Sequence, residues 1–280
     1  MLKISALYIY PIKSLGGIAL DTATLTDRGL QHDRRWMLID VNNRFLSQRE
    51  NAQMALLKTV LTDGGVVVSY TPDDTSIIIP FFSQSEEILE VTVWDDTCNA
   101  LLVSSHIDEW FSEKLNLPAR LVYMPDDSLR QTDPRYTSQG SITSFSDAYP
   151  MLIIGQASLD DLNTRLPDAL PINRFRPNIV FTGGEAYSED TMKHINVNNI
   201  DMHGVKLCAR CVMTTVDQEN AKKGKEPLKT LAKYRLKNNK IYFGQNLVHA
   251  NEGILNVGDA ITVLELHNEE RFFIKPVPMV

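Results

Sequence analysis

The stretch Val205-Lys-Leu-Cys-Ala-Arg-Cys-Val-Met-Thr-Thr-Val-Asp217 carries most of the information about the fold of this chain. Branched, β-favouring residues stand on both sides of the two cysteines, so we expect strands at Val205–Cys208 and Val212–Val216. A thioredoxin-like Cys-x-x-Cys pair would instead open a helix after a strand. The pattern therefore favours β-structure around both thiols.

The same β pattern extends along most of the chain. Short apolar runs between Gly, Pro, Asn and Asp turn signals predict further strands. We expect them at Ile4–Tyr10, Trp36–Ile39, Val66–Tyr70, Ile77–Ile79, Ile88–Trp94, Arg120–Met124, Asn178–Phe181, Ile241–Phe243 and Ala260–Leu266. Apolar residues at helical spacing predict helices at Ser105–Asn116, at Ser158–Leu166 with Ser158 as the N-cap, and at Glu226–Leu236. Since strands and helices do not alternate, we expect a mainly β chain with a few helices (α+β), built on a β-barrel.

The length of 280 residues allows two ordinary domains, each with its own core. A polar stretch with two prolines, residues 125–140, separates the halves and predicts an exposed connection. We therefore expect domains at 1–124 and 125–280.

Charge and hydropathy limit the classes of partner. The chain has 28 basic and 35 acidic residues, so its net charge of −7 does not attract nucleic acid or anionic membranes. Any anion-binding site must therefore be local. No apolar run reaches the roughly 18 residues of a membrane helix, and the N-terminus lacks a signal-peptide pattern. We expect a cytoplasmic protein with no nucleic-acid or membrane partner.

The three cysteines are Cys98, Cys208 and Cys211. They are too few for a disulfide framework or for an iron–sulfur cluster with four thiolate ligands. Half a zinc site lacks its second ligand pair, but a buried structural pair stays open as an interpretation of Cys208 and Cys211. Arg210 between these two thiols favours a thiolate, the form that binds a soft metal. We expect Cys98 to be buried and inert.

Basic residues stand at the ends of several apolar runs. Arg176 lies in Asn173-Arg-Phe-Arg-Pro-Asn-Ile-Val-Phe181, where the following proline holds it extended. Arg34 precedes an apolar strand, and Lys13 and Ser14 follow the first strand together with two glycines. Strand-end salt bridges are one interpretation. The other is that these side chains converge on one anion, which arginine forks and glycine backbone N–H groups bind well.

Long phrases of the sequence resemble the MOSC family. They are Tyr10–Gly17, Arg34-Arg-Trp36, Phe145–Pro150, Ala157–Leu166, Arg174–Phe181, Cys208–Asp217, Gly224–Leu231 and Phe243-Gly-Gln245. More closely, the chain is similar to the subgroup with an N-terminal β-barrel domain, which contains the mitochondrial amidoxime-reducing component and bacterial YcbX-type proteins. The resemblance implies a smaller β-barrel-like domain at 1–124 before a β-barrel MOSC domain at 125–280.

The resemblance also implies a molybdenum cofactor of the molybdopterin type, with Cys211 as the protein's metal ligand and catalytic residue. Cys208 would then be structural or support the ligand. Matching residue by residue implies cofactor contacts from Lys13, Ser14, Arg34, Ser146, Arg176, Asn178, Ala209 through its backbone, Arg210 and Asn246.

The activity that the resemblance implies is the removal of an oxygen atom from an N-hydroxylated small molecule. Some bacterial relatives carry a C-terminal ferredoxin-like domain, and the mitochondrial relatives begin with a membrane anchor. We expect neither here, so electrons should come from a separate donor protein.

Two other functions stay open at this point. One is a sulfur carrier or cofactor-handling protein of the same family, with a persulfide on Cys211. The other is a non-catalytic β-barrel binding module. No proton donor can be assigned, because Asp217 is near the cysteines in sequence but is equally suited to forming a turn.

Overall fold

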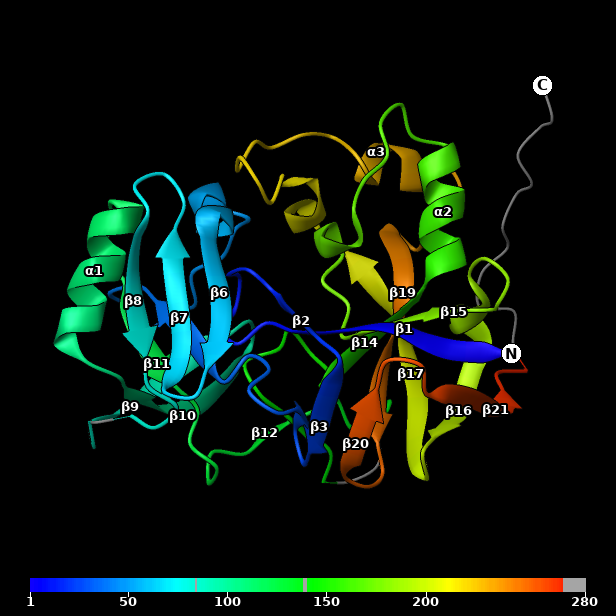
Figure 1. The fold of residues 1–280 in the computed structure, drawn as a ribbon, viewed down its shortest axis with the longest axis horizontal. Helices are drawn as coiled ribbons and strands as arrows, with labels where there is room; N and C mark the ends of the chain where they lie inside the picture. The colour runs from blue at the N-terminus through cyan, green and yellow to red at the C-terminus, as the bar shows by residue number, and fades with distance from the viewer. Residues whose placement is uncertain (84, 138–139, 269–280) are drawn as a thin grey trace.

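Two groups of strands, each around its own buried core, lie side by side in a computed structural model of the chain (Figure 1). The structure describes residues 1–83, 85–137 and 140–268. We call the two groups the N-terminal body and the barrel.

The barrel is a closed ring of seven strands. In order around it they are β14 (Met151–Gly155), β15 (Ile179–Thr182), β1 (Leu2–Ile9), β21 (Ala260–Leu266), β16 (Met192–Val197), β17 (Ile200–Arg210) and β19 (Lys240–His249). The pairing of β19 with β14 closes the ring. Two short strands extend it: β2 (Ile18–Leu20) pairs with β1, and β18 (Leu236–Lys237) pairs with β19. Beside the barrel lies a small sheet of β20 (Gly253–Asn256), β3 (Thr22–Thr26) and β4 (Gly29–Leu30).

The N-terminal body contains two antiparallel sheets and one helix. One sheet is β6 (Leu57–Thr62), β7 (Gly65–Tyr70) and β8 (Thr75–Ile79); the other is β5 (Trp36–Ile39), β11 (Arg120–Tyr123), β10 (Asp96–Leu102) and β9 (Ile88–Val93). The helix α1 (Ser105–Leu115) buries Ile107, Phe111 and Leu115 against these strands. A short pair, β12 (Arg130–Gln131) and β13 (Ile142–Thr143), follows in the chain.

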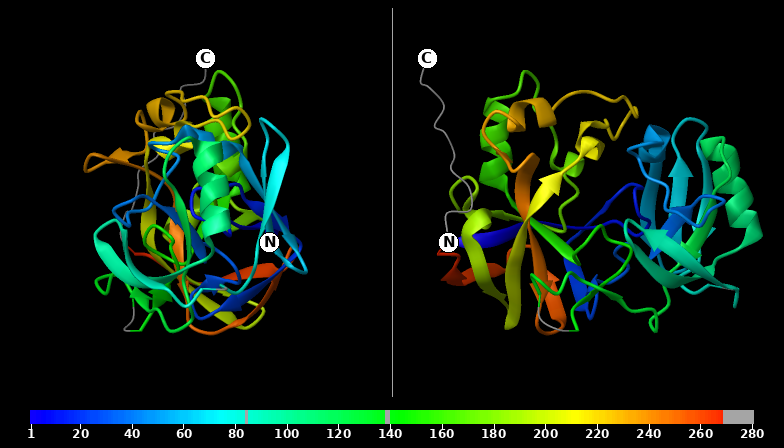
Figure 2. Two further views of the ribbon diagram at one scale, coloured as in Figure 1. Left: turned by 90° about the vertical axis from the view of Figure 1, so that its left-hand side faces the viewer. Right: turned by 180° about the vertical axis from the view of Figure 1, so that it is seen from behind.

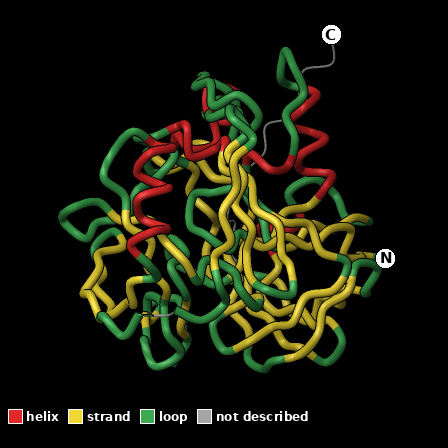
Figure 3. Tube along the Cα trace, turned by 60° about the vertical axis from the view of Figure 1, so that its left-hand side comes forward, coloured by secondary structure: helices red, strands yellow, loops and turns green. Residues whose placement is uncertain are grey.

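The remaining helices are short and lie around the strands (Figure 3). They are α2 (Gln156–Thr164), α3 (Leu228–Leu231) and the 3-10 turns η1 (Ala52–Leu56), η2 (Ile172–Arg174), η3 (Ser188–Thr191) and η4 (Val212–Thr215). Among the residues described, none of the helices has both the length and the apolar character that crossing a membrane requires.

The predicted fold class is confirmed: the chain is mainly β with a few helices, and its largest sheet is a barrel. The strands at 36–39 and 260–266 and the helix that begins at Ser105 are placed as expected. Cys98 is buried, also as expected.

Three local predictions were wrong. Val212–Thr215 is a 3-10 turn, because the hydroxyls of Thr214 and Thr215 donate hydrogen bonds to the carbonyls of Cys211 and Val212 and so stabilise the turn. Helix α2 has Gly155 at its N-cap, since the Ser158 hydroxyl bonds the Glu189 carboxylate instead. The helix expected at Glu226–Leu236 is reduced to the single turn of α3.

The first strand connects the two bodies. The expected division at residue 125, which stays a prediction, assigns β1 to the N-terminal part, yet β1 is hydrogen-bonded between β15 and β21 in the barrel. Figure 2 shows β1 (dark blue) inside the barrel before the chain passes to the other body. Leu7 and Ile9 point into the barrel core because alternate residues of a strand face the same side. Ile4 joins them because the pairing of β1 with β15 shifts register between Ile4 and Ala6. The loop that leaves β1 therefore begins at the boundary between the two bodies.

Because Leu7 is fully buried in the barrel core, we expect Leu7→Ala to destabilise the protein by about 2–5 kcal/mol, measured by urea unfolding. Val60 on β6 is 57% exposed, so Val60→Ala is the control and should change stability by less than about 0.5 kcal/mol. A loss at Leu7 no larger than in the control would contradict the placement of β1 in the barrel.

Candidate functional site

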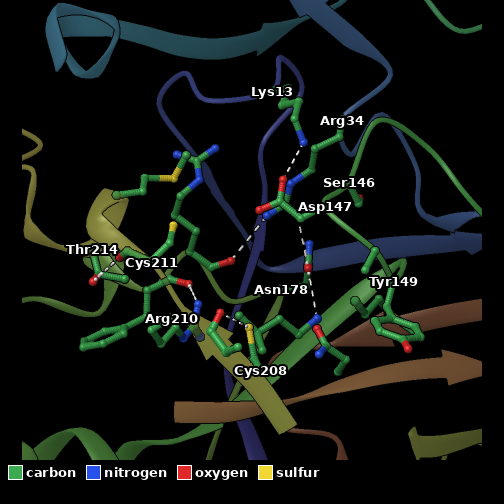
Figure 4. A pocket seen from close by; sticks show the side chains of 18 of the residues that line it. Lys13, Arg34, Ser146, Asp147, Tyr149, Asn178, Cys208, Arg210, Cys211 and Thr214 are labelled. Atoms are coloured by element: carbon green, nitrogen blue, oxygen red, sulfur yellow. Dashed lines mark hydrogen bonds and ion pairs between the residues drawn. The ribbon is translucent and has the colours of Figure 1, made fainter. Parts of the chain in front are cut away.

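One open pocket between the two bodies collects all ten residues that the sequence singled out. Its empty volume is about 770 Å³ including the space at its mouth. The predicted residues on its wall are Lys13, Ser14, Arg34, Ser146, Arg176, Asn178, Ala209, Arg210, Cys211 and Asn246. Figure 4 labels six of them, which come from segments far apart in sequence: Lys13, Arg34, Ser146, Asn178, Arg210 and Cys211. Their roles as ligands stay predictions, but the structure brings every one of them together.

Three of these residues have an unusual backbone conformation. Ser14, Arg34 and Arg176 have φ angles of 67°, 49° and 53°, in the left-handed region that residues other than glycine rarely adopt. The extended conformation predicted for Arg176 from the following proline was therefore wrong. Each such residue costs on the order of 1 kcal/mol or more, and such strain tends to cluster at functional sites. Strain at three positions on one wall therefore supports a binding role for this wall.

Two of the arginines flank one aromatic ring. The guanidinium carbon of Arg34 lies 4.3 Å from the centre of the Tyr10 ring, and that of Arg176 lies 4.1 Å from it. Burial, together with the neighbouring charge of Arg34, lowers the pKa of Arg176 to about 10. The sequence analysis did not assign Tyr10, because nothing in its local pattern shows that two distant arginines pack on it. Cation–π contacts offset part of the cost of holding two like charges close together.

Arg34 is oriented by a buried pair of side chains. It forms an ion pair with Asp33, and its Nη1 donates a hydrogen bond of 3.2 Å to Oδ1 of Asn178. The amide nitrogen of Asn178 donates to the carbonyl of Tyr8. Asn178 thus lies at the pocket wall but uses its amide to hold Arg34 and the first strand. Its expected contact with a cofactor stays a prediction.

Lys13 carries a buried charge in the same pocket. Its Nζ donates to the carbonyl of Phe145 at 2.7 Å and to Oδ1 of Asp147 at 2.6 Å. Burial lowers the pKa of Lys13 to about 8, and the Asp147 carboxylate opposes this shift. The exposed side chain of Asp147 also accepts a bond from Nε1 of Trp94. Sequence reasoning missed Asp147, because its partner is 134 residues away.

The two thiols of the Cys-x-x-Cys motif both reach the pocket. Cys211 is half-buried and follows the last residue of β17, and the hydroxyl of Thr214 holds its carbonyl. Burial raises the pKa of Cys208. The guanidinium of Arg210 donates to the carbonyls of Phe243 and Phe175. Within residues 1–83, 85–137 and 140–268, no cluster of three or more His, Cys, Asp or Glu side chains is arranged to hold a metal ion.

Several buried polar atoms at the pocket wall have no hydrogen-bond partner among the residues that the structure describes. They are Oγ of Ser14, the hydroxyl of Tyr149, Nη1 of Arg174 and Nη2 of Arg210. Buried donors of this kind cost free energy unless a bound group satisfies them. Together with Lys13 and the two arginines on Tyr10, they fit a ligand with several negative oxygens, such as a phosphate. Arg174 lies in the segment Arg174–Phe181 that resembles the MOSC family, but it was not among the predicted site residues.

Asp217 forms a turn. Its Oδ1 accepts hydrogen bonds from the backbone N–H groups of Glu219 and Asn220, which is the pattern of an Asx turn. Its Oδ2 lies 3.9 Å from Nη2 of Arg174. The turn-forming interpretation of Asp217 therefore has direct structural support.

The charge of Lys13 gives a pH-dependent contribution to stability. Between pH 8 and pH 10.5 the unfolded state binds more protons at Lys13 than the folded state, so stability rises with pH over this window. Relative to Lys13→Met, the wild type should gain on the order of 2–3 kcal/mol between these limits, measured by urea unfolding. Parallel pH profiles for the two proteins would show that Lys13 titrates normally.

Comparison with family models matches the chain in two parts. Residues 1–118 match the MOSC N-terminal beta barrel domain, and residues 141–262 match the MOSC domain. The second match contains the motif with Cys208 and Cys211, whereas Lys13 and Arg34 lie in the first.

Several characterised proteins are similar over most of this chain. Mitochondrial amidoxime reducing component 2 of Bos taurus is 32% identical over 242 residues, covering 83% of this chain and 72% of its own length. Mitochondrial amidoxime-reducing component 1 of Mus musculus is 31% identical and covers 93% of this chain and 82% of its own length. Molybdenum cofactor sulfurase of Oryza sativa subsp. japonica is 30% identical over 87% of this chain and 32% of its own length.

Proposed function

Since this chain belongs to the MOSC family, with the N-terminal β-barrel domain in front of its MOSC domain, we propose that it is a molybdenum-cofactor enzyme that reduces N-hydroxylated compounds. The observation that carries the proposal is the pocket in which the Cys211 thiol and several buried cations face one space. The similarity to proteins named amidoxime-reducing components supports the type of reaction.

The residues present fit such a cofactor. Cys211 would supply the thiolate to the metal, as the polarisable sulfur suits molybdenum. Arg34, Arg176 and Ser14 would hold the pterin phosphate, because their donors are grouped and Oγ of Ser14 lacks a partner. Arg210 would contact the cofactor through Nη2, which has no partner among the described residues. The remaining predicted contacts are Lys13, Ser146, Asn178, Ala209 and Asn246.

When bound, the cofactor supplies a metal centre that exchanges an oxygen atom and two electrons. The overall reaction is R–NHOH plus two electrons and two protons to R–NH₂ and water. The chain's own part is to bind the cofactor, to fix the thiolate, and to leave the mouth of the pocket open to a small-molecule substrate. We propose that a separate protein donates the electrons, and that the enzyme works in the cytoplasm without a cluster of its own.

Cys211→Ser tests the metal-binding role. In a host that makes the cofactor, the wild type should carry molybdenum near one per chain, and Cys211→Ser should lose it along with reduction of N-hydroxylated purines, because the thiolate is the only protein ligand in the proposal. Elemental analysis and an assay with a chemical reductant measure the two effects. Cys98→Ser is the control, since Cys98 is buried in the N-terminal body.

Molybdenum retained by Cys211→Ser would contradict the assignment of the ligand. A wild type that carries the cofactor but reduces no hydroxylamine, amidoxime or N-hydroxylated purine would contradict the reaction.

A second candidate is a sulfur carrier with a persulfide on Cys211. It is supported by the 30% identity to a molybdenum cofactor sulfurase over 87% of this chain. Sulfane sulfur on purified protein, without molybdenum, would favour it. Cyanide releases such sulfur as thiocyanate, so the two candidates are separated by thiocyanate and metal analysis of one preparation.

A further inference from the structure

A lysine-rich surface follows the metal-ligand motif in the chain. Residues 219–240 contain seven lysines and one arginine against two glutamates, a net charge of +6. Since the whole chain carries −7, the other residues carry −13. We call the exposed lysines of this segment the lysine surface: Lys222, Lys223, Lys225, Lys229, Lys233, Lys237 and Lys240. The positive charge of an acidic protein is thus concentrated in one short stretch.

The fold fixes the lysine surface beside the pocket. The backbone N–H of Asp217 bonds the carbonyl of Lys222, and the N–H of Gly224 bonds the carbonyl of Thr215 in the η4 turn. That turn begins directly after Cys211 and contributes Met213 and Thr214 to the pocket wall. The first lysines are therefore attached to the segment that positions the thiol.

The lysine surface also extends across both bodies. Nζ of Lys223 donates to the carbonyl of Arg49 in the N-terminal body, while Leu231 of α3 packs in one core cluster with Leu159 and Leu162 of α2. Figure 1 shows this segment (gold) running over the top of the structure from the N-terminal body to α2. These two contacts hold the segment against both bodies.

Most of these charges have no counter-ion in the described part of the chain. Among the residues that the structure describes, no carboxylate forms an ion pair with Lys222, Lys225, Lys229 or Lys233. Four exposed ammonium groups without partners create a local positive field, which attracts an acidic surface from solution and is strongest at low salt.

We propose that the lysine surface is the docking site for an acidic electron-donor protein, which would deliver electrons to the cofactor beside Cys211. The inference rests on the proposed function, because that reaction consumes two electrons that this chain must receive. Electron transfer between proteins requires the donor to lie close to the acceptor, and the lysine surface is the positively charged region attached to the pocket wall. Redox encounters of this kind use small, charge-steered interfaces.

A nucleic acid or an anionic membrane fits this surface less well. A long polyanion would extend past the lysines onto a protein that carries −13 elsewhere, where it is repelled. Sites for single strands also need exposed aromatic rings for base stacking, but Tyr234, an aromatic residue within the segment, is buried. A compact acidic protein can bind the lysine surface without contacting the negatively charged remainder of the chain.

The test measures docking separately from catalysis. Immobilised holo-protein is exposed to a reduced acidic plant-type ferredoxin and to an acidic flavodoxin, and association is followed at low and high salt. The variant Lys222→Glu/Lys225→Glu/Lys229→Glu should lower the association rate of these donors by about tenfold or more at ~20 mM salt, and the difference should vanish near ~0.5 M. A second variant, Lys229→Glu/Lys233→Glu, reverses two charges of the lysine surface and leaves the sequence of the turn after Cys211 unchanged.

The matched control is Lys3→Glu/Arg44→Glu, which reverses two exposed charges outside the segment. It should bind the donors within about twofold of the wild type. With a dithionite-reduced viologen at high salt, all variants should reduce an N-hydroxylated purine at the wild-type rate, whereas donor-driven turnover should fall only in the lysine variants.

Three results would overturn the docking proposal: no binding of either acidic donor to the wild type, an equal loss in the control, or tighter binding of anionic vesicles or single-stranded RNA than of the donors. Failure of the proposed function has another signature. In that case the wild type does not reduce the substrate even with the viologen, regardless of how the donors bind.

Discussion

The packing of Arg34 and Arg176 on the ring of Tyr10 is the interaction on which the site depends. Burial and the neighbouring charge of Arg34 lower the pKa of Arg176. The buried ring and the Asp33 carboxylate reduce the cost of holding these two charges close together, and an anion bound near both guanidinium groups would reduce it further. The barrel positions Tyr10 for this contact. β1 pairs with both β15 and β21, so Tyr10, directly after the end of β1, lies at the boundary between the two bodies.

The backbone near the Tyr10 ring is also held in an unfavourable conformation, as expected of a preformed binding site. The left-handed conformations of Ser14, Arg34 and Arg176 are unfavourable, and they persist because the surrounding structure fixes them. Asn178 bonds Arg34, and the carbonyl of Leu15 accepts from Nη1 of Arg176, so the loops from both bodies hold each other's side chains. A pocket that is organised before its ligand arrives lowers the entropic cost of binding.

Much of the site could be predicted from the sequence because its residues stand at strand ends, where a barrel brings distant segments together. Local pattern drew attention to Arg176 before a proline and to Cys211 beside Arg210, but it left other interpretations open. Their assignment to one site came from the resemblance to the MOSC family. Asp147 and Tyr10 were not, since their roles arise from contacts with residues more than a hundred positions away. The strand expected at Val212–Val216 failed for a local reason: β-branched residues favour strands on average, but threonine hydroxyls can instead stabilise a turn.

The positive charges of the protein act at short range in the pocket and at long range on the lysine surface. Inside the pocket, the cations are buried and are held by carbonyls, by the carboxylates of Asp33 and Asp147 and by the Tyr10 ring, which suits the tight binding of a small, multiply charged group. On the lysine surface, the ammonium groups are exposed, and within the described part of the chain those of Lys222, Lys225, Lys229 and Lys233 form no ion pair. Each contributes little to affinity but adds to a long-range field. A resident cofactor needs the first kind of site, and a partner that must arrive and leave in every catalytic cycle needs the second. Because η4 connects the two, a single segment of about thirty residues, from the end of β17 to the start of β19, carries both.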